Sequence, residues 1–232
     1  MYNPQPRRAC HGFTILEMSV VLVVIALIIG GVSVGRDVYR GAVAERISTE
    51  FVQGWMIAYD RYTSQVGAVP KDNPANPTGR INGGAGDELC DDELRDEMLR
   101  RGITLPQGRA EGFESHYVYQ DSNGSPQNLR VCFLNVNDWS EPATGNSYAT
   151  RPRNVMRIEG LTAELANQID LRIDGRIDAR FGRFRENSQY SNTNTIGSPP
   201  TENPWSESDP DAATYNREGN IPTMVGYLKM NR

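Results

Sequence analysis

Met18–Gly35, MSVVLVVIALIIGGVSVG, is a run of eighteen uncharged residues close to the start of the 232-residue chain. It consists mainly of Val, Ile and Leu, and a helix needs about 20 apolar residues to cross the ~30 Å hydrocarbon core of a membrane. Phe13, Ile15 and Leu16 extend the run towards the N-terminus. The stretch therefore predicts one membrane-spanning helix, on which the organisation of the remaining chain depends.

The polar segment before this run predicts its orientation. Residues 1–12, MYNPQPRRACHG, contain Arg7 and Arg8, and basic residues keep the flanking end of a membrane helix in the cytoplasm. No small-x-small cleavage site clearly follows the apolar run, so removal of the run as an ordinary secretory signal is not expected. We therefore expect the rest of the chain to be exported while the helix anchors it.

One carboxylate lies near the start of the apolar segment. An unpaired Glu17 would cost roughly 2.5–3.5 kcal/mol at a helix centre and less near the membrane surface. Cleavage between Gly12 and Phe13 would create an ammonium group about one helical turn from this carboxylate. Because intramembrane carboxylates are rare, a plain anchor with an incidental glutamate is the less favoured interpretation.

The sequence Gly12-Phe13-Thr14-Ile15-Leu16-Glu17, followed by the apolar run, resembles the class III leader and N-terminal helix of type IV pilins and pseudopilins. The resemblance covers residues 7 to about 66. It implies that a prepilin peptidase cleaves after Gly12 and methylates Phe13. It also implies that Glu17 neutralises the N-terminal amine of a neighbouring pilin subunit, at an inner-membrane assembly platform powered by a separate cytoplasmic ATPase.

The apolar pattern continues beyond Gly35 with the spacing of one helix face. Apolar residues recur every three or four positions at Val43, Ile47, Phe51, Trp55, Ala58, Tyr62 and Val66. We therefore divide the chain into a leader (1–12), a membrane or filament-core half-helix (13–35), an amphipathic half-helix (36–66) and an exported head (67–232). The expected fold is α+β and pilin-like, with a long N-terminal α-helix packed on an antiparallel β-sheet with extended loops.

Turn signals and apolar periodicity divide the head further. The segment DSNGSP contains Asn-Gly, a strong hairpin signal, between strands expected at 116–120 and 129–136. Further strands are expected at 154–159 and 221–229, helices at about 87–101 and 162–178, and a long surface loop at 187–220. Four aromatic residues are interpreted as core: Tyr117, Tyr119, Phe133 and Trp139.

Gly31-Val32-Ser33-Val34-Gly35 satisfies two motifs with different meanings. As a G-x-S-x-G hydrolase motif it would require a strand-to-helix turn and a histidine base. The segment lies inside the expected apolar helix, so the required turn is excluded. As G-x-x-x-G, Gly31 and Gly35 would allow close approach of another helix in an apolar environment. We favour helix packing over simple tolerance of glycine.

Cys90 and Cys132 are the two cysteines of the exported part, because Cys10 belongs to the leader. Disulfides persist outside the cytoplasm, so a Cys90–Cys132 bridge is predicted, with two separate buried thiols as the alternative. Too few cysteines and histidines are present for a structural zinc site.

Acidic residues cluster in two places, at 87–93 and at Asp209 and Asp211. Neither matches an EF-hand loop, so a solvated acidic face is the favoured interpretation and calcium the alternative; no other cofactor or metal is expected. Asp170, Asp174 and Asp178 recur every four residues, as do Arg172, Arg176 and Arg180, which predicts like-charge stripes and salt bridges to neighbouring elements or subunits.

Charge and composition restrict the remaining function classes. The net charge of −5 makes nucleic acid an unexpected partner, and neither Lys71 nor Lys229 follows a glycine, so no P-loop is present. His116 is read as a strand residue without chemistry, and nothing marks a catalytic pair, so the protein is not expected to be an enzyme.

The favoured function is a structural one. We expect a bacterial inner-membrane protein with a single span and a periplasmic head, which enters an extracellular or periplasmic filament. A mature chain of residues 13–232 is large for a major pilin and suits a minor pilin. The alternatives are a pseudopilin of a type II secretion system and a membrane-tethered periplasmic binding protein or enzyme.

Overall fold

The computed structural model describes residues 13–84, 86–108, 114–195, 203–205 and 221–231. The chain divides into two compact units, residues 1–42 and 43–232. Helical residues run without interruption from Ile15 to Val66. They form α1 (Ile15–Arg46), a π-helical turn η1 (Ile47–Val52) and α2 (Gln53–Val66). By length and composition, this helix is the one described segment that could cross a membrane.

The π-helical turn has a visible cause in the apolar spacing. Val43, Ile47, Phe51, Trp55 and Tyr59 follow one another at intervals of four, and in a helix of 3.6 residues per turn such a series drifts around the axis. The wider π turn compensates for this drift. As a result the last four of these side chains are all fully buried. The turn η1 was not predicted from the sequence, although this spacing was a signal for it.

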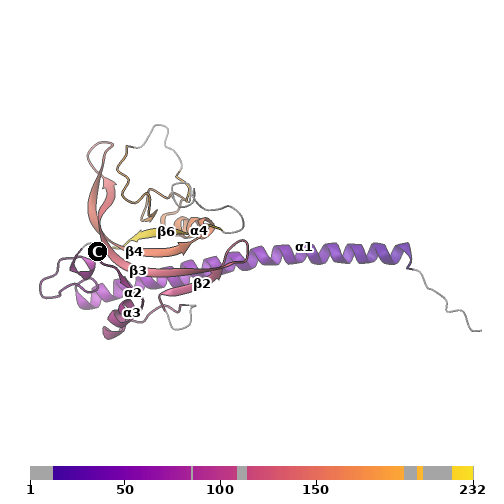
Figure 1. Cartoon of the computed structure of the whole chain (residues 1–232), viewed down its shortest axis with the longest axis horizontal. Helices are drawn as coiled ribbons and strands as arrows, with labels where there is room; N and C mark the ends of the chain where they lie inside the picture. The colour runs from indigo at the N-terminus through magenta and orange to yellow at the C-terminus, as the bar shows by residue number, and fades with distance from the viewer. Residues whose placement is uncertain (1–12, 85, 109–113, 196–202, 206–220, 232) are drawn as a thin grey trace, which may run out of the picture. The chain divides into compact units, whose positions relative to one another are not determined.

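The second unit contains a six-stranded sheet in which all paired strands are antiparallel, in the order β1-β3-β4-β6-β5, with β2 also paired to β3. Figure 1 labels β2, β3, β4 and β6 of this sheet. The predicted α+β, pilin-like fold is confirmed. The strands are β1 (Leu89–Cys90), β2 (His116–Gln120), β3 (Pro126–Pro142), β4 (Tyr148–Leu161), β5 (Phe184–Glu186) and β6 (Met224–Lys229).

Each face of the sheet contributes side chains to a buried hydrophobic cluster. On one face, the end of the long helix packs on β2 and β3, where the ring centroids of Phe51 and Tyr117 lie 5.4 Å apart and those of Trp55 and Phe133 6.0 Å apart. Alternate β3 and β4 residues point to the other face. There Trp139 packs against the ring of Tyr190, whose segment follows β5. The four aromatic residues interpreted as core are all buried.

Several predicted boundaries were wrong. The strands expected at 129–136 and 154–159 are the middle parts of β3 and β4, which together form one long hairpin. The helix expected from 87 begins at Asp91 as α3 (Asp91–Arg100), because residues 89–90 form β1 instead. The last strand begins at Met224 rather than 221. Within the predicted loop 187–220, residues 187–192 are hydrogen-bonded to the sheet, and 196–202 and 206–220 lie outside the described residues.

The helix expected over 162–178 is shorter. It is α4 (Ala163–Asp174), which ends because Gly175 has φ +76°, a left-handed conformation that favours glycine. Asp178 therefore lies beyond the helix. The predicted salt bridge to a neighbouring element is confirmed for Arg172, which pairs with Glu45 of α1.

The predicted stripe of aspartates was wrong. The carboxylates of Asp174 and Asp178 accept hydrogen bonds from the backbone N–H groups of Arg180, Phe181, Arg183 and Phe184. Asp170 accepts the Asp178 N–H, so all three aspartates order the chain after α4 rather than forming a stripe.

Candidate functional site

The first part of α1 presents apolar side chains to its surroundings. Phe13 is 78% exposed and Ile15 92% exposed. None of the apolar stretch that could span a membrane is buried inside the described chain. Large exposed apolar surfaces on a chain mark contacts with membrane or protein. The predicted anchor therefore has the length and the exposed apolar surface that its expected role requires.

Glu17 is held by a local hydrogen-bond arrangement at the start of α1. The Thr14 backbone N–H donates to Glu17 Oε2 at 2.8 Å, and the Thr14 hydroxyl donates to the same oxygen at 3.1 Å. In return the Glu17 backbone N–H donates to Thr14 Oγ1 at 3.2 Å. This reciprocal pattern is a capping box, which satisfies free N–H groups at a helix start. Thr14 thus positions the predicted assembly carboxylate within one chain.

The other residues predicted for processing and packing are placed as follows. Gly12 lies outside the described residues, and Phe13 directly precedes the capped helix. A Cβ atom added at Gly31 or Gly35 would meet no atom of the described chain within 4 Å. Packing inside the subunit therefore does not demand glycine at these positions, and their role against another helix stays a prediction.

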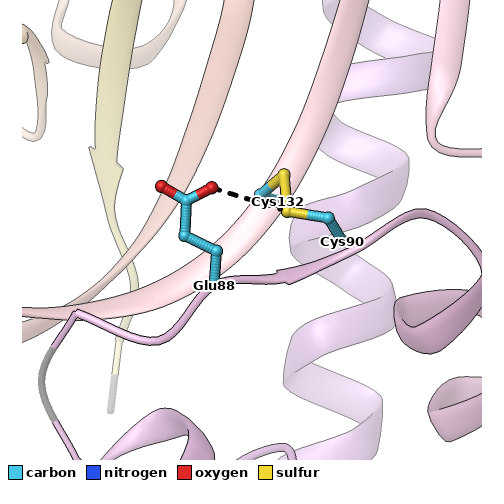
Figure 2. Close-up of side chains that lie close together, drawn as sticks. All are labelled: Glu88, Cys90 and Cys132. Carbon is cyan, nitrogen blue, oxygen red and sulfur yellow. Dashed lines mark hydrogen bonds between the residues drawn. A yellow bond between two sulfur atoms is a disulfide. The ribbon is translucent and has the colours of Figure 1, made fainter.

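Cys90 and Cys132 form a disulfide in the structure, with their Cα atoms 4.5 Å apart (Figure 2). They are directly paired in the β1–β3 ladder, which brings the two sulfur atoms together. Glu88 Oε2 lies 3.7 Å from Cys90 Sγ, and the three side chains have the close spacing of a metal site. Disulfide sulfurs are not thiolates, and the thiolate is the form that ligates metals. This cluster therefore does not fit a thiolate metal site in its oxidised state.

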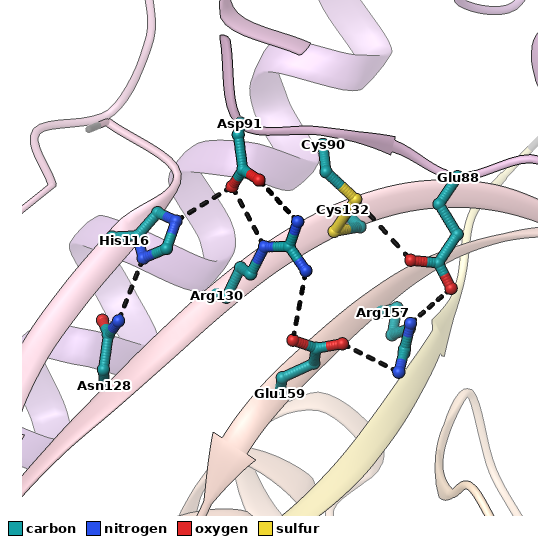
Figure 3. Close-up of polar contacts among 9 residues, drawn as sticks. All are labelled: Glu88, Cys90, Asp91, His116, Asn128, Arg130, Cys132, Arg157 and Glu159. Carbon is teal, nitrogen blue, oxygen red and sulfur yellow. Dashed lines mark hydrogen bonds and ion pairs between the residues drawn. A yellow bond between two sulfur atoms is a disulfide. The ribbon is translucent and has the colours of Figure 1, made fainter. Parts of the chain in front are cut away.

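A ladder of alternating charges surrounds the disulfide on the β3–β4 surface (Figure 3). Arg130 binds Asp91 through both carboxylate oxygens, at 2.5 and 3.0 Å. It also reaches Glu159 at 3.5 Å. Arg157 then joins Glu159 at 2.8 Å and pairs with Glu88. We call these five residues the charge ladder. It connects residues 88–91 to β3 and β4. Glu88 is exposed, as expected for a solvated acidic face, but both Glu88 and Asp91 are ion-paired to the sheet, which was not predicted.

His116 ends the ladder on β2. Its Nε2 lies 2.9 Å from Asp91 Oδ1, and its Nδ1 lies 3.0 Å from Asn128 Nδ2. If the Asn128 amide donates to Nδ1, a neutral His116 carries its proton on Nε2 and donates it to Asp91. The bond to Arg130 holds the pKa of Asp91 low, at about 2, with a further contribution from His116. His116 is thus a strand residue, as expected, with a structural hydrogen bond.

Replacing Asp91 with Asn should lower the free energy of unfolding at pH 7 by about 1 kcal/mol, because this bidentate ion pair is half exposed. The pKa of Asp91 is lower in the folded chain than the ordinary aspartate value of 3.8. Its contribution is therefore complete above about pH 4 and is lost as the pH falls towards 2. Urea unfolding at pH 7 and pH 3 measures both effects. Asp92→Asn, at an exposed neighbouring carboxylate, is the control and should change stability by less than about 0.5 kcal/mol; equal losses in both variants would contradict the prediction.

The charge ladder was missed in the sequence because it depends on strand register. Arg130 lies opposite Glu159, and Cys132 opposite Arg157, only for the pairing that β3 and β4 adopt. A shift of one residue would turn each of these side chains to the other face. The one available signal was that Arg130 and Arg157 each lie between apolar residues of an expected strand.

Residues 7–33 match the model of the prokaryotic N-terminal methylation motif. No curated protein and no solved structure matches the chain significantly. The matched residues include Gly12, Phe13 and Glu17 and most of the exposed apolar part of α1. The match covers the first part of the long helix and none of the head. Together with a helix that continues onto an antiparallel sheet, it supports a type IV pilin-like protein.

Proposed function

We propose that this chain is a prepilin that becomes a minor subunit of a type IV pilus-like filament. One observation carries the proposal. The exposed apolar helix begins with a capping box that includes Glu17, and Glu17 lies inside the matched methylation motif. A helix of this kind suits two apolar surroundings in succession. It anchors the precursor in the inner membrane and later packs against other helices in a filament core.

Glu17 supplies the pairing step in this proposal. After cleavage, the methylated ammonium of Phe13 in one subunit meets the Glu17 carboxylate of another, and the two charges neutralise each other in an apolar environment. The head, in which the disulfide and the charge ladder attach residues 88–91 to the sheet, lies on the outside of the filament as a structural unit. The role is assembly and not catalysis, and the partners are a prepilin peptidase, other pilin subunits and an inner-membrane assembly platform.

The test is intact mass and N-terminal sequencing of the chain recovered from membranes, with and without an active prepilin peptidase. We expect a peptidase-dependent mature chain that begins with N-methylated Phe13. Gly12→Val should prevent cleavage, because the bulkier side chain replaces the residue after which the peptidase cuts, whereas Gly31→Ala should be processed normally. An uncleaved chain beginning at Met1 in cells with active peptidase would overturn the proposal.

The same preparation tests the kind of filament. Recovery of the mature chain at low copy number in sheared surface pili, and the loss of piliation on its deletion, is the expected result. Unchanged piliation together with loss of secretion of an exported enzyme would replace the pilus assignment with a type II secretion pseudopilin.

A further inference from the structure

Asp170 is a completely buried carboxyl group with an asymmetric set of contacts. Its Oδ2 accepts hydrogen bonds from the Asp178 backbone N–H at 2.7 Å and from the Trp205 indole N–H at 2.8 Å. Its Oδ1 is buried and has no hydrogen-bond partner among the described residues. No ion pair within the described part of the chain includes Asp170. A buried carboxylate with one unpartnered oxygen and no cation is costly, whereas a proton on Oδ1 would remove the charge and leave both bonds to Oδ2 intact.

The carboxyl group holds a separate piece of chain in place. Trp205 is 2% exposed, and its ring centroid lies 4.6 Å from that of Phe184. The Asn203 carbonyl accepts the Ala179 N–H at 2.8 Å, and the Asn203 amide donates to Asp178 Oδ1 at 3.2 Å. Residues 203–205, which we call the docked segment, therefore attach to α4 and to the chain that follows it.

The charges around Asp170 favour its neutral form. The negative charges of Asp174 on α4 and of Asp178 after it both disfavour a negative charge on Asp170. Arg176 pairs with Asp178 at 2.5 Å, and Arg185 of β5 directs its guanidinium to the carbonyls of Gly182, Ser140 and Tyr190. The docked segment contributes an uncharged indole. Burial, followed by the two carboxylates, raises the pKa of Asp170 to about 7, although the two hydrogen bonds act in the opposite direction.

We propose that Asp170 is a neutral carboxylic acid while the docked segment is in place, and that ionisation of Asp170 weakens docking, so that this contact is strengthened by acid. Undocking would expose the carboxyl group to water and return its pKa towards the ordinary aspartate value of 3.8. Because the docked form binds the proton more tightly, docking is strongest below about pH 4. It weakens as the pH rises towards 7 and is constant above, a change of up to about 10³-fold.

The test is ¹⁹F NMR of the full-length chain in detergent micelles, labelled with 5-fluorotryptophan, between pH 4 and pH 8. The chain has three tryptophans, and Trp205→Phe identifies the resonance of the docked segment. We expect this resonance to change with pH while those of Trp55 and Trp139 stay constant. Asp170→Asn keeps an acceptor oxygen but has no proton to lose, so it should abolish the change. Glu164→Gln, at an exposed carboxylate of α4, is the matched control and should preserve it.

A Trp205 resonance that is independent of pH in the unmodified chain would overturn the proposal, as would a pH response that persists in Asp170→Asn. If Asp170→Asn does not fold, infrared spectra of the unmodified chain test the protonation directly. The C=O stretch of a neutral, buried carboxylic acid should be present at pH 6 and absent at pH 8. Its absence at pH 6, where exposed carboxyl groups are already ionised, would contradict the proposal.

Discussion

Replacing Glu17 with Gln should leave cleavage and methylation at Phe13 intact but reduce incorporation into filaments at least about tenfold, equivalent to about 1.4 kcal/mol. Gln keeps the length and the acceptor oxygen of Glu, so the capping box with Thr14 can persist. It has no charge to pair with the Phe13 ammonium of another subunit. That ammonium would then be buried in an apolar core without a counterion, at a cost of several kcal/mol.

The measurement is the fraction of mature chain in sheared filaments relative to membranes, determined by immunoblotting. Thr14→Ala is the matched control, because it removes the hydroxyl partner of Glu17 while the carboxylate remains. It should cost only about 0.5–2 kcal/mol of local helix stability and should still assemble. Normal incorporation of Glu17→Gln would contradict charge pairing as the assembly step.

Replacing Arg185 with Met should destabilise the head by about 2–5 kcal/mol. Arg185 is 5% exposed and lies over the Trp139 ring, with Cζ 4.5 Å from the ring centroid. It donates Nε to the Gly182 carbonyl at 2.9 Å and Nη1 to that of Ser140 at 2.7 Å. Met can fill part of the space but cannot donate to the Gly182 and Ser140 carbonyls, and the contact with Ser140 is fully buried. Burial lowers the pKa of Arg185 to about 10, so the guanidinium is charged at neutral pH and its bonds are charge-assisted.

Urea unfolding of the full-length chain in micelles, followed by far-ultraviolet circular dichroism, measures this loss. Arg151→Met is the control, because Arg151 is 58% exposed at the side chain and lies 3.9 Å from Glu141. It should change stability by less than about 0.5 kcal/mol. Equal stability of the two variants would show that the carbonyls near Arg185 find other partners.

The parts of the fold that could be predicted were those with local causes. The apolar run and its flanking charges indicated α1, and the Asn-Gly turn predicted the β2–β3 hairpin, in which Gly124 has φ +85°. The spacing from Phe51 to Tyr62 predicted which face of the helix packs on the sheet. Each of these signals lies within a few residues of the feature that it predicts.

The parts that could not be predicted depend on pairs far apart in the sequence. The charge ladder joins Asp91 to Arg130 across 39 residues, and the indole of Trp205 reaches Asp170 across 35. Arg185 binds the carbonyl of Ser140, 45 residues away. Such pairs are determined by the strand register and by the path of the loops. Neither can be predicted from composition or periodicity. The end of α4 was misplaced for a different reason, because the four-residue spacing that leads to Asp178 was given more weight than Gly175, the local signal that ends the helix.

The attachment of residues 88–91 to the sheet has a consequence for the order of events outside the cytoplasm. Two kinds of interaction attach this segment to the sheet, a disulfide that reductants break and ion pairs that acid and salt weaken. Neither a reductant, nor acid, nor salt alone removes both kinds of interaction. In a newly exported chain whose thiols are still reduced, the ion pairs with Arg130 and Arg157 can already place Cys90 opposite Cys132. The disulfide would then form between two cysteines that the ion pairs have already brought together, and disulfide formation would not depend on a random encounter of the two thiols.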